Sequence, residues 1–98
     1  MDMKECIAVC AECRDACLAC EAKCREMSHD EMAEMCHACH LQCSACLDAM
    51  NAGSNAECGP CAAICRDCGA ECATVDEPTH KRCAEACAKC ADACGQMA

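Results

Sequence analysis

The chain has 98 residues, of which nineteen are cysteine, seven are methionine and none is Phe, Tyr or Trp. So short a chain needs a well-filled core, and without aromatic side chains that core has to be built largely from cysteine. The formal net charge of −9 repels nucleic acid phosphates and anionic membrane surfaces, so we expect no nucleic acid and no membrane as a partner.

Two further features of the sequence bear on where the protein works. Charged residues interrupt every window before the roughly 20 apolar residues that a membrane-spanning helix needs. The first residues include Asp2 and lack the apolar run of a secretory signal, and an odd number of cysteines cannot all pair within one chain. We therefore expect a cytoplasmic protein whose cysteines are metal ligands and not a disulfide framework.

The cysteines follow one spacing rule in four segments of the chain. Inside each segment, the steps between consecutive cysteines alternate strictly between three and four residues. This alternation is typical of a helix that presents one stripe of side chains, whereas a strand would need even steps. We call the stripe the cysteine seam. Its members are Cys6, Cys10, Cys13, Cys17, Cys20, Cys24, Cys36, Cys39, Cys43, Cys46, Cys58, Cys61, Cys65, Cys68, Cys72, Cys83, Cys87, Cys90 and Cys94.

In chain order, the first two segments predict helices over residues 2–27 and 30–52. Gly53 can close the second of these helices, because glycine is favoured just past a helix end. Helix starts are indicated by pairs with the spacing of a capping box. These pairs are Asp2 with Glu5, Ser28 with Glu31, and Ser54 with Glu57.

The third and fourth segments predict helices over residues 56–74 and 77–96. The pair Gly59–Pro60 lies directly after the first cysteine of the third segment, so this helix either kinks there or begins at Pro60. The fourth helix is expected to start near Pro78, since proline is tolerated in a first turn, and to end near Gly95.

Four helices joined by short connections predict an all-α protein. The expected architecture is an antiparallel up-down-up-down four-helix bundle formed by one domain, residues 1–98. Turning the four seams inward fills the centre of this bundle with thiols. The sequence therefore predicts a cysteine-lined core.

Several uses of so many thiols can be weighed against one another. The cysteines could be small hydrophobes that only fill the core, but alanine, valine or leucine would fill it without nineteen oxidisable groups. Disulfides within a helix are disfavoured, because neighbouring Cβ atoms on a helix lie about 5–6 Å apart and a disulfide needs about 3.8 Å. Iron–sulfur motifs usually place their ligands on irregular loops. A thiol–disulfide oxidoreductase needs one low-pKa cysteine pair, and no pair here is set apart, so we expect no enzyme.

Charge favours Cu(I) among the metals that thiolates bind. A zinc ion with four thiolates keeps a net charge of about −2, so a stack of such sites would bury heavy charge. Each Cu(I) displaces one thiol proton, and bridging thiolates allow about one copper per cysteine in a neutral core. Multiple Cu(I) ions are thus the expected cargo. The alternative is metallothionein-like sequestration of Zn, Cd or Cu.

The seams continue past cysteine at both ends of the expected bundle. Antiparallel packing gathers four further candidate ligands at one end, together with Met27. We call them the mouth residues: His29, Met32, Met35 and His80. Thioether and imidazole groups bind Cu(I) more weakly than thiolates do, which suits a place where copper enters and leaves.

Other sulfur and imidazole side chains are expected to have plainer roles. Met3, Met50 and Met97 gather at the opposite end, where we expect them to plug the bundle. His37 and His40 fall off the seam of the second helix, so we expect them to be solvated or interfacial and not ligands.

The whole chain resembles the four-helix bundle copper storage proteins, specifically their cytosolic branch. The resemblance rests on the four seams together, on the run from Cys83 to Cys94, and on the His29, Met32, Met35, Cys36 group. It implies Cu(I) storage by thiolates lining the bundle, loading through the mouth residues, and a homo-tetramer. Copper ions are then the main partner, and a copper chaperone is a further expected partner.

Overall fold

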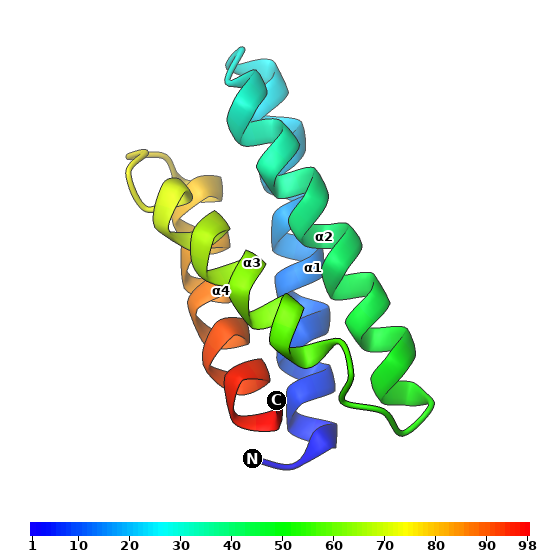
Figure 1. Cartoon of the computed structure of the whole chain (residues 1–98). Helices are drawn as coiled ribbons and strands as arrows, with labels where there is room; N and C mark the ends of the chain where they lie inside the picture. Colours follow the sequence, from blue (N-terminus) through cyan, green and yellow to red (C-terminus); the bar gives the residue numbers. More distant parts are fainter.

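The computed structural model describes residues 1–98 as four α-helices without any strand. The helices are α1 (Met3–Glu26), α2 (Asp30–Asn51), α3 (Cys58–Cys72) and α4 (Pro78–Met97). They run alternately up and down, and both chain termini lie at the same end of the bundle (Figure 1). The predicted all-α class and four-helix architecture are confirmed. None of the helices is both long and apolar enough to cross a membrane.

Each helix packs against two neighbours and leaves the diagonal helix further away. Helix α1 contacts α2 and α4, and α3 contacts the same two helices. The bundle measures 38 × 18 × 17 Å, which is long and narrow. Its centre is consequently a thin column along which side chains from all four helices can meet.

All nineteen seam cysteines point into this column and have no solvent-exposed surface. The remaining core consists mainly of small residues, with Leu47 and Met50 the larger aliphatic side chains among them. Cysteine is a small hydrophobe when it is neutral, so the seam supplies the apolar core that the rest of the sequence lacks. The predicted cysteine-lined core is confirmed.

Helices α1 and α4 begin with side-chain caps. The Asp2 carboxylate accepts a hydrogen bond from the Glu5 backbone N–H at 2.8 Å, as the predicted capping box requires. The Glu77 carboxylate accepts one from the His80 N–H at 2.9 Å, and Pro78 occupies the first turn of α4.

The capping boxes predicted at Ser28 and Ser54 are wrong, because both serines belong to the end of the preceding helix. Ser28 has a positive φ of 59°, and the following His29 N–H donates to the Cys24 carbonyl at 2.8 Å. Gly53 has a φ of 86°, and the Ser54 N–H donates to the Ala49 carbonyl at 2.9 Å. These are Schellman motifs, which satisfy the last carbonyls of α1 and α2. Gly53 closes α2 as predicted.

The start of α3 and the end of α4 lie close to the proline and glycine residues noted in the sequence. Helix α3 begins at Cys58, with Pro60 in its first turn, where a missing N–H costs no helical hydrogen bond. Cys58 is therefore fully buried on the seam. Gly95 does not end the fourth helix, which continues through Met97.

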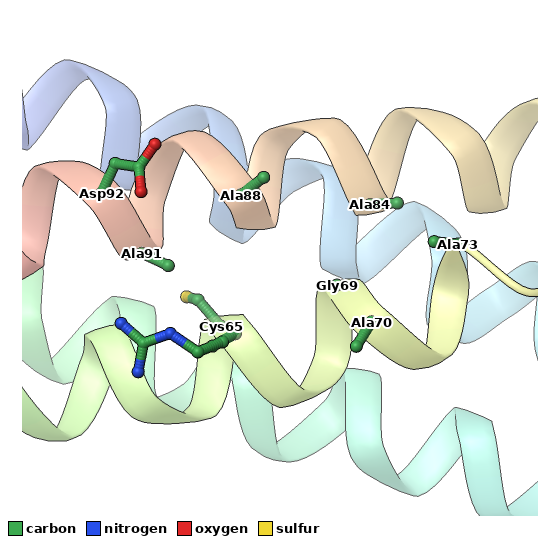
Figure 2. A pocket seen from close by; sticks show the side chains of 9 residues that line it. Cys65, Gly69, Ala70, Ala73, Ala84, Ala88, Ala91 and Asp92 are labelled. Atoms are coloured by element: carbon green, nitrogen blue, oxygen red, sulfur yellow. The ribbon is translucent and has the colours of Figure 1, made fainter.

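Small residues on α3 and α4 bring these two helices close together. Their outer surface carries a groove of about 360 Å³ (Figure 2). It is lined by Cys65, Arg66, Gly69, Ala70, Ala73, Ala84, Ala88, Ala91 and Asp92. A Cβ atom placed on Gly69 would lie only 2.9 Å from the Cβ of Cys87, so the interface requires glycine at this position.

We expect Gly69→Ala to destabilise the bundle by about 1–3 kcal/mol, because the added methyl group forces α3 away from α4. Gly95→Ala is the matched control, since a Cβ at Gly95 meets no atom within 4 Å. That change should be neutral or should stabilise the helix by up to about 0.5–1 kcal/mol. Urea unfolding followed by circular dichroism, under reducing and anaerobic conditions, measures both. A Gly69→Ala variant as stable as the parent would contradict this account of the interface.

Candidate metal-binding site

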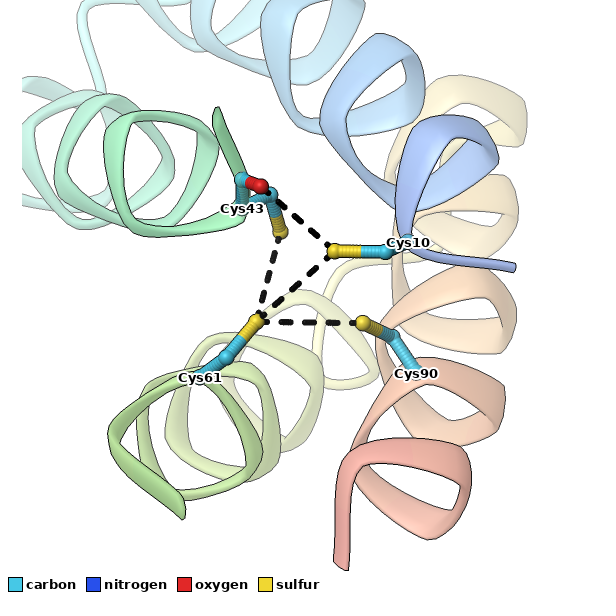
Figure 3. Close-up of side chains that lie close together, drawn as sticks. All are labelled: Cys10, Cys43, Cys61 and Cys90. Atoms are coloured by element: carbon cyan, nitrogen blue, oxygen red, sulfur yellow. Dashed lines mark hydrogen bonds between the residues drawn. The ribbon is translucent and has the colours of Figure 1, made fainter. Parts of the chain in front are cut away.

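One layer of the core shows how four helices converge on a common point. Cys10 of α1, Cys43 of α2, Cys61 of α3 and Cys90 of α4 face one another (Figure 3). The Cys61 sulfur lies 4.0 Å from the sulfur of each of the other three. The Cys10 thiol also donates to the Cys43 backbone carbonyl at 3.5 Å.

Similar groups of four thiols follow one another along the column, and they share members. Cys13 and Cys39 belong both to a group with Cys43 and Cys65 and to a group with Cys17. Cys17 in turn belongs to a further group with Cys83. A sulfur that lies within reach of two neighbouring sites can bridge two metal ions. The column is therefore continuous and is not a row of isolated four-ligand sites.

The distances between sulfurs suit metal coordination without rearrangement of the helices. Pairs on different helices lie 3.7 Å apart at Cys13 with Cys65 and at Cys17 with Cys83, and 3.8 Å apart at Cys6 with Cys94. With a metal–sulfur bond of about 2.3 Å, three ligands around one ion are about 4.0 Å apart and four are about 3.8 Å apart. The distances thus fit metal ions with three or with four thiolate ligands. The net charge that each kind of ion leaves in the core has to distinguish between them.

All nineteen thiols are free in the structure, and burial favours their neutral form. Desolvation raises the pKa of Cys24 to about 11, and repulsion from the negative charge that Cys36 carries when ionised adds to the effect. Burial likewise raises the pKa of Cys6 and of Cys46. A metal ion entering the column therefore has to displace protons.

His80 lies at the end of the column, where α1 and α3 end and α2 and α4 begin. Its side chain is fully buried, and its Nε2 lies 3.2 Å from the Cys24 sulfur. Its Nδ1 contacts the Glu77 carboxylate. Partial burial of Glu77 opposes ionisation, but the hydrogen bonds from His80 and from backbone N–H groups lower the pKa of Glu77 to about 2. A carboxylate that holds one imidazole nitrogen leaves the other directed at a metal ligand position.

The other mouth residues lie at the same end. The His29 ring meets the His80 ring edge to face, with centroids 6.1 Å apart, and the buried Nδ1 of His29 has no hydrogen-bond partner. Met32 and Met35 are half-buried and line a hollow of about 250 Å³ together with Glu31 and Glu71. Met32 also borders a second hollow beside His29, so the two parts of the mouth adjoin.

The remaining methionines differ in exposure between the two ends. Met27 is exposed at the mouth end. At the opposite end Met50 is buried, and Met3 and Met97 are half-buried against the core. The Asn55 side chain donates a hydrogen bond to the Met97 carbonyl at 2.6 Å. This end is more tightly filled than the mouth.

Sequence reasoning missed two acidic groups at the mouth and the surroundings of two histidines. Glu77 stands three residues before His80, the spacing of an N-cap, which could have indicated its contact. Glu71 is brought to Met35 only by tertiary packing. His37 and His40 were expected to be solvated or interfacial, and both lie against Glu21 at the α1–α2 interface.

Comparisons with known proteins agree on one family. The sequence model of the family described as Csp, copper storage protein, matches residues 1–98. A Bacillus subtilis (strain 168) protein described as uncharacterized cysteine-rich protein YhjQ is 36% identical over 100 residues, which cover 95% of this chain and 93% of that protein.

Two solved structures are similar over nearly the whole chain. One is described as the Cu(I)-bound copper storage protein BsCsp3, with a TM-score of 0.92, 34% identity, and coverage of 97% of this chain and 96% of that chain. The other is apo Csp3 from Bacillus subtilis, with a TM-score of 0.92, 33% identity and coverage of 98% of both chains.

We expect the metal-free bundle to lose stability in alkali. A thiol whose pKa is raised by folding contributes stability that is complete below its unfolded pKa, about 8.5, and is lost as the pH rises through its folded pKa. For Cys24 this window extends to about pH 11. Between its unfolded and folded pKa values, each such thiol lowers the free energy of unfolding by about 1.4 kcal/mol per pH unit.

Urea unfolding at pH 7, 9 and 10, with reductant and without oxygen, measures this effect. Cys24→Ala removes one ionising group and should give a shallower decline between pH 9 and 10 than the parent chain. Stability that stays constant or rises over this range would show that the buried thiols are not held neutral.

Proposed function

The chain belongs to the copper storage protein family, and from this premise we propose that it stores Cu(I) at high capacity, with about one copper ion per cysteine. The single observation that carries the stoichiometry is the sharing of thiols between successive groups of four along the core. Sulfurs shared in this way can each bridge two ions, so the number of ions is set by the number of thiols. All nineteen seam cysteines are the proposed ligands.

Charge balance explains why Cu(I) fits this core better than zinc. Every Cu(I) that binds replaces one thiol proton, so the interior stays neutral at any degree of filling. Zinc with four thiolates removes four protons and brings two charges, which leaves each site about −2 in a column closed to solvent. Metallothionein-like binding of zinc or cadmium is therefore the weaker alternative.

Copper is proposed to enter and leave through the mouth residues. His80 is the link between mouth and store, because one ring nitrogen is held by Glu77 and the other faces the Cys24 thiol. His29 offers an unpartnered nitrogen nearby, and Met32 and Met35 line the adjoining hollow. Weak, exchangeable ligands at the mouth would pass copper to the stronger thiolates inside.

The proposal extends to the setting in which the store works. Cu(I) binding requires reduced thiols, and a reducing cytoplasm maintains them, so we place the protein there. The family resemblance suggests a homo-tetramer and a copper chaperone as donor or recipient. Light scattering on the metal-free and loaded chain tests the tetramer directly.

We expect anaerobic titration with Cu(I), in competition with a chromophoric chelator, to withdraw copper until the bound ions approach the nineteen thiols in number. Saturation at about four or five ions would instead indicate isolated four-thiolate sites. Electrophoretic mobility during the titration gives an independent check. It should hardly change with Cu(I), whereas zinc loading should make the chain more anionic.

The mouth is tested by the combined change His29→Gln, Met32→Leu, Met35→Leu and His80→Gln. Capacity should be nearly unchanged, because the thiols hold the store, but copper uptake and its removal by chelators should slow. The matched control is Met3→Leu, Met50→Leu and Met97→Leu, which removes the same thioether chemistry from the opposite end with little change in volume. Stopped-flow rates compare the two. Equal rates would show that the mouth is misassigned, and a slower control would place it at the other end.

A further inference from the structure

We propose that Glu21, His37 and His40 form a separate site for one Zn²⁺ ion on the outer surface of the bundle, between α1 and α2. These three residues are not part of the thiol column or of the mouth. The proposal therefore stands independently of copper storage. It also reverses the expectation, drawn from the seam alone, that the two histidines are not ligands.

Three ligand atoms already form the face of a coordination polyhedron. The Glu21 Oε1 atom lies 3.2 Å from His37 Nδ1 and 3.3 Å from His40 Nε2. The two nitrogens are 3.3 Å apart. Zinc–nitrogen and zinc–oxygen bonds of about 2.0 Å in a tetrahedron place neighbouring ligand atoms about 3.3 Å apart. The observed triangle thus needs almost no adjustment to accept the ion.

The positions of the ligands follow from the packing of the two helices. His37 and His40 are three residues apart on α2, so their rings share one face, and they meet edge to face with centroids 5.0 Å apart. Glu21 of α1 faces them across the interface. The ligand set is consequently divided between two helices, and an ion would join α1 to α2.

Arg25 prepares the carboxylate for this role. Its Nη2 donates to the Glu21 Oε2 atom at 2.9 Å, one helical turn away on α1, which leaves Oε1 for the histidines. Partial burial of Glu21 is outweighed by hydrogen bonds from Arg25 and His37, so the pKa of Glu21 is lowered and the group is an anion at neutral pH. Hydrogen-bonded carboxylates of this kind are typical around metal ligands.

The chemistry of the ligands separates this site from the store. Two imidazoles and one carboxylate are the protein ligands of zinc sites that keep a fourth position for water. That position is accessible here, since the His37 ring is half-exposed. Cu(I) prefers the thiolates of the core, so the two sites would take different ions. Without an ion, the same atoms form a hydrogen-bond cluster, and that is the competing explanation.

The test is a Zn²⁺ titration of the ¹⁵N-labelled chain after its thiols have been filled with Cu(I), without oxygen. Imidazole ¹⁵N signals report on His37 and His40 individually. We expect both to shift with one Zn²⁺ per chain, through Nδ1 of His37 and Nε2 of His40. The same titration of the metal-free chain shows whether the two imidazoles bind Zn²⁺ when the free thiols compete for it. The test therefore does not depend on successful loading with copper.

Three variants give the result its specificity. His37→Gln with His40→Gln should abolish the binding of one Zn²⁺ ion per chain. Glu21→Gln should weaken this binding by more than about tenfold. Arg14→Gln is the matched control, because it breaks an exposed ion pair on the same helix, that of Arg14 with Asp15, but leaves the three ligands and Arg25 in place, so it should retain Zn²⁺ binding. Circular dichroism confirms that each variant is helical. The proposal is wrong if the imidazole signals do not shift with Zn²⁺, or if Glu21→Gln and the parent chain bind Zn²⁺ with equal affinity. The three side chains would then form a hydrogen-bond cluster only.

Discussion

The whole structure depends on burying nineteen thiols in one narrow column. Buried groups of this kind are stable only when neutral, either as thiols or as thiolates balanced by monovalent metal ions. Both states place no net charge in the core. The same side chains can therefore serve as the hydrophobic core of the empty bundle and as the ligands of the full one, without a change of fold.

Small side chains have a second consequence, which is close packing of the helices. Cysteine and alanine fill little volume, so the helices approach until sulfurs from diagonal helices meet, as at Cys13 and Cys65. At one point even a methyl group is too large, and Gly69 lies against Cys87. Contacts across the diagonal make each sulfur a neighbour of several others. This sharing is what turns a set of sites into a continuous store.

Much of this could be predicted from the sequence, because one periodic signal governs it. The strict alternation of steps determined the helices, the seam and the buried core, and Cys58 lies on the seam despite the neighbouring Gly59–Pro60. Local end signals were less informative. Ser28 and Ser54 have the spacing of capping boxes, but the Schellman motifs that end α1 and α2 occupy both positions. Spacing alone does not distinguish a residue that begins a helix from one that ends its predecessor.

The acidic partner of His37 and His40 could not be predicted in the same way, since it comes from another helix. Glu21 reaches His37 and His40 only through the packing of α1 on α2, and sequence separation gives no sign of it. Glu77 is the exception, because it caps the helix that carries His80. In both places a carboxylate orients imidazole, yet the rest of the surroundings differ. His80 faces a buried thiol and suits a soft monovalent ion, whereas the pair beside Glu21 has a half-exposed His37 ring and suits a divalent one. Burial and the neighbouring sulfur, more than histidine itself, thus decide which metal each place can hold.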